Sequence, residues 1–167
     1  MKNIISVIIL VLIANQAFSQ NNQPNKYPTI SGYIGTAIPV LSINKNETST
    51  NFTSEFSLGI PIGININKSE NLSYTTEITP VLSFTDKSSS VVNLAILSGV
   101  LLSKNNFTYG IRAAFETGGR YGMSLSALKS IYKQENYNIV IGLPLDIRLG
   151  KSLPASFGTG LILVIVI

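Results

Sequence analysis

Apolar and non-apolar residues alternate along much of this 167-residue chain. Between Phe52 and Ile66, seven of the eight even positions are large and apolar, whereas the odd positions are polar, small or proline. A helix would need apolar residues three and four positions apart, so a period of two predicts a strand with one apolar face. The pattern returns between Tyr137 and Leu149. The chain is therefore predicted to be all-β.

Turn-forming residues divide the chain after residue 28 into eight such runs. The connectors are short, and a parallel crossover needs about a dozen residues or more, so neighbouring strands are expected to be antiparallel. In the sixth run, Ser124 to Ser130 also fits a helical turn, and a strand there places Lys129 on the apolar face. The predicted strands are Thr29 to Ile43, Phe52 to Ile66, Leu72 to Thr85, Val91 to Ser103, Phe107 to Thr117, Tyr121 to Lys133, Tyr137 to Leu149 and Ser156 to Ile167.

The runs are 11 to 15 residues long. This exceeds the length of about 5 to 6 residues that is usual in globular sheets, and it covers the roughly 9 to 11 residues that a tilted membrane-spanning strand needs. In lipid, every backbone polar group must be paired within the protein, which a closed sheet achieves and an open sheet does not. We therefore predict an eight-stranded antiparallel up-and-down transmembrane β-barrel over residues 29–167.

The first 19 residues have the three parts of a secretory signal peptide. Lys2 is the positive charge, Ile4 to Ala14 is the apolar stretch, and Ala17-Phe18-Ser19 is the cleavage site. The apolar stretch is shorter than the roughly 20 residues of a membrane-spanning helix. Cleavage is expected to leave a mature chain that starts near Gln20, with residues 20–28 as a flexible polar leader.

Alternation alone does not say which face points outward, because soluble and membrane barrels have opposite polarity. Only 12% of the residues are charged, against about 25 to 35% of an ordinary soluble surface. This favours an apolar face toward lipid, with Ile60 or Ile62 outside and Gly59 and Gly63 in the lumen. Six charges within the strands lie on the non-apolar face, which predicts a structural lumen charge cluster of Glu55, Glu77, Arg112, Glu116, Asp146 and Arg148.

Two of these charges stand at equal height in the predicted barrel. Glu77 and Arg112 each lie five residues from the periplasmic end of their strands, and a narrow lumen lets side chains meet across it. We predict that they pair near mid-height and that the other four charges form a second cluster nearer the outer end.

Aromatic residues are predicted to form two bands, as expected at the two interfaces of a bilayer. One band lies near the periplasmic strand ends and the other near the opposite ends. The first holds Tyr74, Phe107, Tyr109, Tyr132 and Tyr137, and the second holds Phe52, Phe84, Phe115, Tyr121 and Phe157.

The signal ending Ala17-Phe18-Ser19, the eight strands with small turns, and the repeated phrases at Leu58 to Ile64 and Ile141 to Leu145 resemble the small outer-membrane β-barrel domain proteins of Gram-negative bacteria, with an OmpA/OmpX-like architecture. The resemblance implies a bacterial outer-membrane location and insertion by the barrel-assembly machinery. Such proteins often end in an aromatic residue, whereas this chain ends in Ile167.

The composition narrows the range of functions. The chain has neither Cys nor His, which excludes thiolate or imidazole metal sites and His-based catalysis. We expect no enzyme activity, no cofactor, no nucleic-acid partner and a monomer, with a structural or interaction role and a lumen filled by side chains. The alternatives are a secreted or periplasmic soluble β-barrel that binds a small apolar ligand, and a narrow outer-membrane channel.

Overall fold

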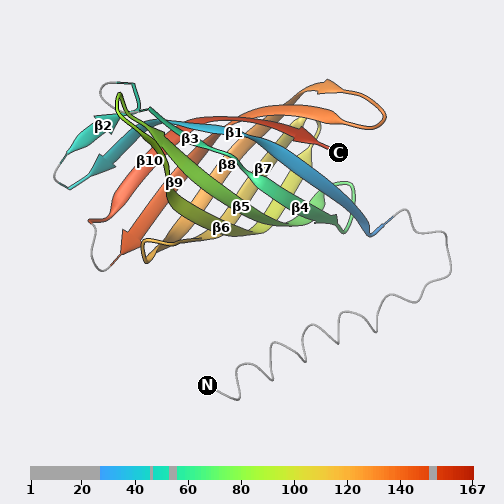
Figure 1. Cartoon of the computed structure of the whole chain (residues 1–167). Helices are drawn as coiled ribbons and strands as arrows, with labels where there is room; N and C mark the ends of the chain where they lie inside the picture. The colour runs from blue at the N-terminus through green and yellow to red at the C-terminus, as the bar shows by residue number, and fades with distance from the viewer. Residues whose placement is uncertain (1–26, 46, 53–55, 151–153) are drawn as a thin grey trace, which may run out of the picture.

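The computed structural model describes residues 27–45, 47–52, 56–150 and 154–167. The predicted signal peptide and residues 20–26 of the leader lie outside the described residues. In the described part, no helix is long and apolar enough to span a membrane. Its regular structure consists of β1 (Thr29–Asn44), β2 (Thr48–Thr50), β3 (Phe56–Gly59), β4 (Ile62–Asn67), β5 (Leu72–Phe84), β6 (Ser89–Lys104), β7 (Phe107–Glu116), β8 (Arg120–Lys133), β9 (Asn138–Gly150) and β10 (Ser156–Val166) (Figure 1).

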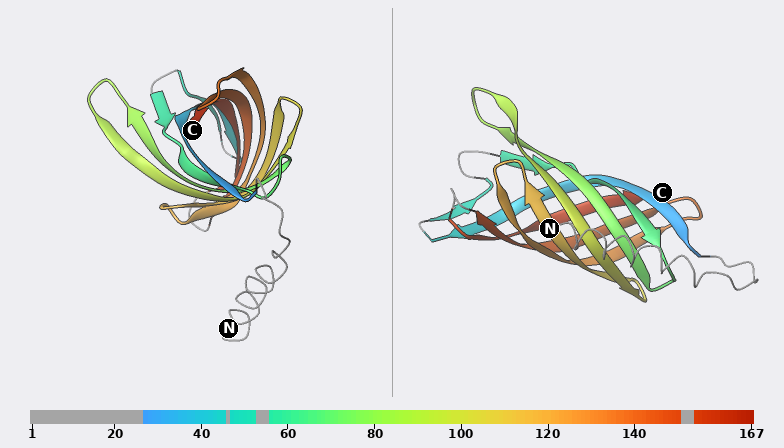
Figure 2. Two further views of the ribbon diagram at one scale, coloured as in Figure 1. Left: turned by 90° about the vertical axis from the view of Figure 1, so that its right-hand side faces the viewer. Right: turned by 90° about the horizontal axis from the view of Figure 1, so that it is seen from below.

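The strands form one antiparallel sheet that closes on itself. From β5 to β10 each strand pairs with the next in sequence, and β10 pairs back with β1 between Tyr33 and Asn44. Because β3 and β4 share the position between β1 and β5, the ring has eight strand positions (Figure 2). The predicted all-β antiparallel class is confirmed. We call the end where β1 begins and β10 ends the terminal end, and the other the opposite end.

The second predicted strand is interrupted, because the ladder breaks at Ile60 and Pro61 between β3 and β4. The register with β5 is the same on both sides of the break. Proline has no N–H to donate, so Ile60 opposite Pro80 and Gly35 opposite Pro61 each form one backbone hydrogen bond and not two. These bonds run from the Ile60 N–H to the Pro80 carbonyl and from the Gly35 N–H to the Pro61 carbonyl, each at 3.0 Å.

Two other segments differ in detail from the expected strands. The predicted connector between Asn44 and Asn51 contains β2, which pairs with the end of β1. Its residues lack an apolar alternation, so the pattern gave no sign of a strand. The alternative helical turn at Ser124 to Ser130 is absent, because β8 is one strand with a register shift between Ser130 and Tyr132.

Polarity is inverted relative to a soluble protein. Ile62 is 50% exposed on the outer face, whereas Gly59 is buried. The ten predicted band aromatics are all among the exposed large side chains. The buried polar or charged residues are Asn65, Thr75, Glu77, Thr79, Ser83, Arg112, Ser124, Ser126 and Arg148.

Candidate functional site in the ring interior

Glu77 on β5 and Arg112 on β7 meet inside the ring. Their strands are separated by β6, whose Leu97 is the register partner of Glu77 and whose Gly99 is the partner of Arg112. The Arg112 guanidinium donates to Glu77 Oε2 at 2.7 Å, and both side chains are almost fully buried. The structure thus brings together the two charges that strand counting places at equal height.

Tyr33 and Thr79 complete the hydrogen bonding of the Glu77 carboxylate. The Tyr33 hydroxyl donates to Oε2 at 2.8 Å, and the Thr79 hydroxyl donates to Oε1 at 2.7 Å. The Thr75 hydroxyl oxygen, Oγ1, lies 3.2 Å from the Tyr33 hydroxyl oxygen and shares a hydrogen bond with it. We call Tyr33, Thr75, Glu77, Thr79 and Arg112 the Glu77 layer. Tyr33 is not among the predicted lumen residues, although it occupies the same face of its strand as Ser31 and Ala37.

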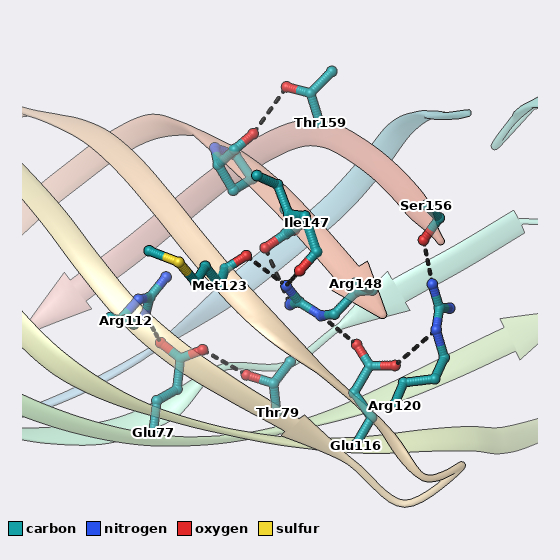
Figure 3. A network of polar contacts seen from close by, with 12 residues as sticks. Glu77, Thr79, Arg112, Glu116, Arg120, Met123, Ile147, Arg148, Ser156 and Thr159 are labelled. Carbon is teal, nitrogen blue, oxygen red and sulfur yellow. Dashed lines mark hydrogen bonds and ion pairs between the residues drawn. The ribbon is translucent and has the colours of Figure 1, made fainter. Parts of the chain in front are cut away.

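A second group of charges lies nearer the opposite end, where Arg148 is the register partner of Ser156 at the start of β10. Figure 3 shows this group beside Glu77 and Arg112. Arg148 donates to Glu116 Oε1 at 2.6 Å and to Asp146 Oδ1 at 3.1 Å. It also donates to the Met123 carbonyl at 2.9 Å. Because Arg148 lies on β9 and Glu116 on β7, their ion pair links these two strands across β8. We call Glu116, Arg120, Asp146 and Arg148 the Glu116 layer.

Arg120 belongs to this layer, although it lies in a predicted connector and is not among the predicted lumen residues. Its Nε lies 4.0 Å from Glu116 Oε2, and its guanidinium also donates to Ser156. The turn between β7 and β8 produces this proximity: Gly119 has φ of 75°, and its N–H donates to the Glu116 carbonyl at 3.0 Å. A positive φ suits glycine, which has no Cβ to clash.

The predicted lumen residues therefore separate into two layers. Glu55 lies outside the described residues. Among the described residues, the charges of the two layers balance, with three carboxylates and three guanidinium groups. These are Glu77, Glu116, Asp146, Arg112, Arg120 and Arg148.

Three cavities lined by described residues lie beside the layers. The largest of these, of about 420 Å³, lies between the Glu77 layer and the terminal end. Another, of about 200 Å³, is lined by charges of both layers, and the third, of about 190 Å³, lies against the Glu116 layer. The described residues contain no group of three or more metal-ligating His, Cys, Asp or Glu side chains. The interior side chains form ion pairs and hydrogen bonds through charged groups, hydroxyls and amides.

No protein-family model matches the chain, and neither does any curated protein. A search of solved structures finds similarity to the solution NMR structure of the de novo designed protein TMB2.3. The two share 10% sequence identity, with a TM-score of 0.46, over 84% of this chain and 96% of the designed chain. This likeness concerns the fold alone.

Proposed function

We propose that the chain is an integral outer-membrane β-barrel protein with a structural or interaction role, a side-chain-filled lumen and no catalytic activity. The observation that carries the proposal is the inverted burial of the described residues. Arg112 is 7% exposed inside the ring, whereas Ile62, Ile111 and Leu143 are 50 to 54% exposed outside it.

Lipid is the environment that suits this arrangement. Soluble monomers rarely expose a contiguous apolar patch larger than about 300 to 600 Å². Here large apolar side chains are exposed on strands all around the ring. Removing this apolar surface from water would gain about 25 cal/mol for each Å², so copies of the ring in water would associate through their outer faces. In a bilayer, lipid acyl chains cover these faces and the copies have no such reason to associate.

The proposal extends to targeting and partners. Export by the predicted signal peptide and insertion by the barrel-assembly machinery follow from the sequence resemblance. Monomeric function is supported by the pairing of β10 with β1 between Tyr33 and Asn44, because neither strand then offers that edge to another chain.

Fractionation of the producing cell tests the proposal. The folded protein should stay in the membrane pellet after carbonate extraction and should migrate faster on SDS gels unless it is boiled. Recovery in the soluble fraction, with no effect of boiling on mobility, would contradict it.

The two alternative functions fit the interior less well. A soluble barrel for an apolar ligand needs an apolar interior, whereas the buried centre here is the Glu77–Arg112 ion pair. The three cavities fit a narrow channel better than they fit a pocket for an apolar ligand. However, the side chains of the two layers block the path from one cavity to the next. Stepwise ion conductance of the wild-type protein in a planar bilayer would support the channel.

A further inference from the structure

The cavity of about 420 Å³ at the terminal end has the size of a small-molecule site, since ligand pockets span about 300 to 1,000 Å³. Its deep end is formed by Glu77 and Arg112 of the Glu77 layer, and its lining extends to the exposed Lys133 at the end of β8. A small solute therefore has a route from solvent to the buried groups.

Two buried polar atoms on this cavity have no hydrogen-bond partner among the described residues. They are Oδ1 of Asn65 on β4 and Nε of Arg112 on β7. Asn65 is 8% exposed and Arg112 is 7% exposed. An unpaired buried polar group costs about 1 to 3 kcal/mol, so native proteins usually supply a partner from protein, water or ligand. One acceptor and one donor are therefore left for a guest in the cavity.

The cavity has two walls of different character. Hydroxyl and amide groups line the side formed by β4 and β5, including Asn67, Ser73 and Thr75. Apolar side chains come from β9 and from its neighbour β10, which contribute Val140, Ile162 and Val164. In a ring of eight positions, β5 and β9 are four positions apart and so face each other. A guest that fills the space meets a polar wall and an apolar wall together.

The charges of the lining favour a neutral guest. Arg112 is already paired with Glu77 at 2.7 Å, and the remaining charge, Lys133, stands at the exposed end. An ion at the deep end would lose its hydration without gaining a free counter-charge. Hydroxyl groups satisfy both unpaired atoms, since each can accept from Arg112 Nε and donate to Asn65 Oδ1.

We infer that this cavity binds a small neutral polyhydroxylated molecule of monosaccharide size. One hydroxyl edge bonds with Asn65 and the Arg112 Nε–H, and an apolar C–H face packs on Val140, Ile162 and Val164. The inference does not depend on whether the outer face contacts lipid, because every group that it uses faces the ring interior.

Nuclear magnetic resonance of the ¹⁵N-labelled full chain tests the site. The chain is folded in lauryldimethylamine oxide, which carries neither a sugar nor a phosphate, and D-glucose is titrated as the probe. The Arg112 Nε–H signal, identified by its loss in Arg112→Lys, should shift saturably with a millimolar dissociation constant, as expected for about a dozen non-hydrogen atoms.

Matched variants locate the binding. Asn65→Leu should weaken glucose binding about tenfold through loss of one hydrogen bond. Asn93→Leu removes an amide that lines the cavity of about 200 Å³, and this control should leave glucose binding unchanged. Val140→Phe should abolish binding by filling the space at the apolar wall, and it covers the case in which Asn65→Leu does not fold.

Three results would overturn the inference. One is a shift with inorganic phosphate and none with glucose, which would indicate an anion site. Another is no shift with either probe, which would mean that water alone occupies the cavity. The third is glucose binding that is unchanged in both Asn65→Leu and Val140→Phe, which would place the sugar elsewhere on the chain.

Discussion

Tyr33 on β1 and Gly63 on β4 are register partners, and the Tyr33 side chain occupies the space where a side chain on Gly63 would begin. A Cβ on Gly63 would lie 2.5 Å from the Tyr33 hydroxyl oxygen and 2.7 Å from the Thr76 carbonyl oxygen. The ring of an aromatic residue laid over a strand glycine is a recurrent device in sheets. Here it directs the Tyr33 hydroxyl to Glu77 at 2.8 Å.

Gly63→Ala should therefore destabilise the protein by about 1 to 3 kcal/mol, because the added methyl group displaces Tyr33 from the Glu77 layer. The free energy of unfolding in guanidinium chloride measures the loss. Gly118→Ala is the control, since a Cβ there meets nothing within 4 Å. The cost should shrink in a Tyr33→Ala background, and an equal cost would show that the tyrosine is not the obstacle.

The Glu77–Arg112 pair should be strongly coupled. Removing either partner leaves a buried charge without its counter-charge, at a cost of about 3 to 5 kcal/mol in a dry interior and far less if water enters. The double variant Glu77→Ala/Arg112→Ala should lose less than the sum of the single variants. The combination of Glu77→Ala with Arg148→Ala is the control, because these two charges lie in different layers. Additive losses for the first pair would deny the interaction.

Arg120 should contribute much less than Arg148. The Arg120 side chain is 23% exposed, and its Nε lies 4.0 Å from the Glu116 carboxylate. The Arg148 side chain is 10% exposed, and its Nε lies 2.6 Å from the same carboxylate. Partly exposed pairs contribute about 0 to 1 kcal/mol. Arg120→Ala should therefore change the free energy of unfolding by about 1 kcal/mol or less, and Arg148→Ala by several times more. A reversed order would refute this ranking.

Arginine substitution on the outer face should have a cost that depends on depth. Ile62 and Ile66 both point outward from β4, but the register partner of Ile66 is the band residue Tyr74. Ile62→Arg should cost about 2 to 4 kcal/mol near the bilayer midplane, and Ile66→Arg about 0 to 1 kcal/mol near the interface. Unfolding in lipid vesicles gives both values. Equal costs would argue against a membrane-embedded outer face.

The predicted signal peptide can be tested separately, because small residues are required at its cleavage site. N-terminal sequencing of the membrane-inserted protein should return Gln20 or a residue near it. Ala17→Lys should block processing, while Asn21→Lys beyond the site should not. Detection of Met1 at the start of the inserted wild-type protein would be incompatible with cleavage.

Local pattern was enough to predict the sheet but not its irregularities. In a strand, successive side chains point to opposite faces, so alternation from Tyr137 to Leu149 directly reports β9 and its apolar face. The interruption at Ile60 and Pro61 depends on Pro80 of a neighbouring strand as well, and β2 forms only because β1 extends far enough to pair with it. Such features involve partners that a single run of residues does not identify.

The sequence by itself determined the all-β class, the approximate strand ranges and the face on which the charges lie, because these follow from the two-residue period of each strand. Strand counting also matched Glu77 with Arg112, since both stand at equal height above short turns. Only the tertiary structure decided that Arg148 bridges Glu116 and Asp146, that Arg120 joins them and that Tyr33 crosses Gly63 to reach Glu77. Those contacts depend on the register between strands and on closure of the ring, which together set which side chains converge in a narrow interior.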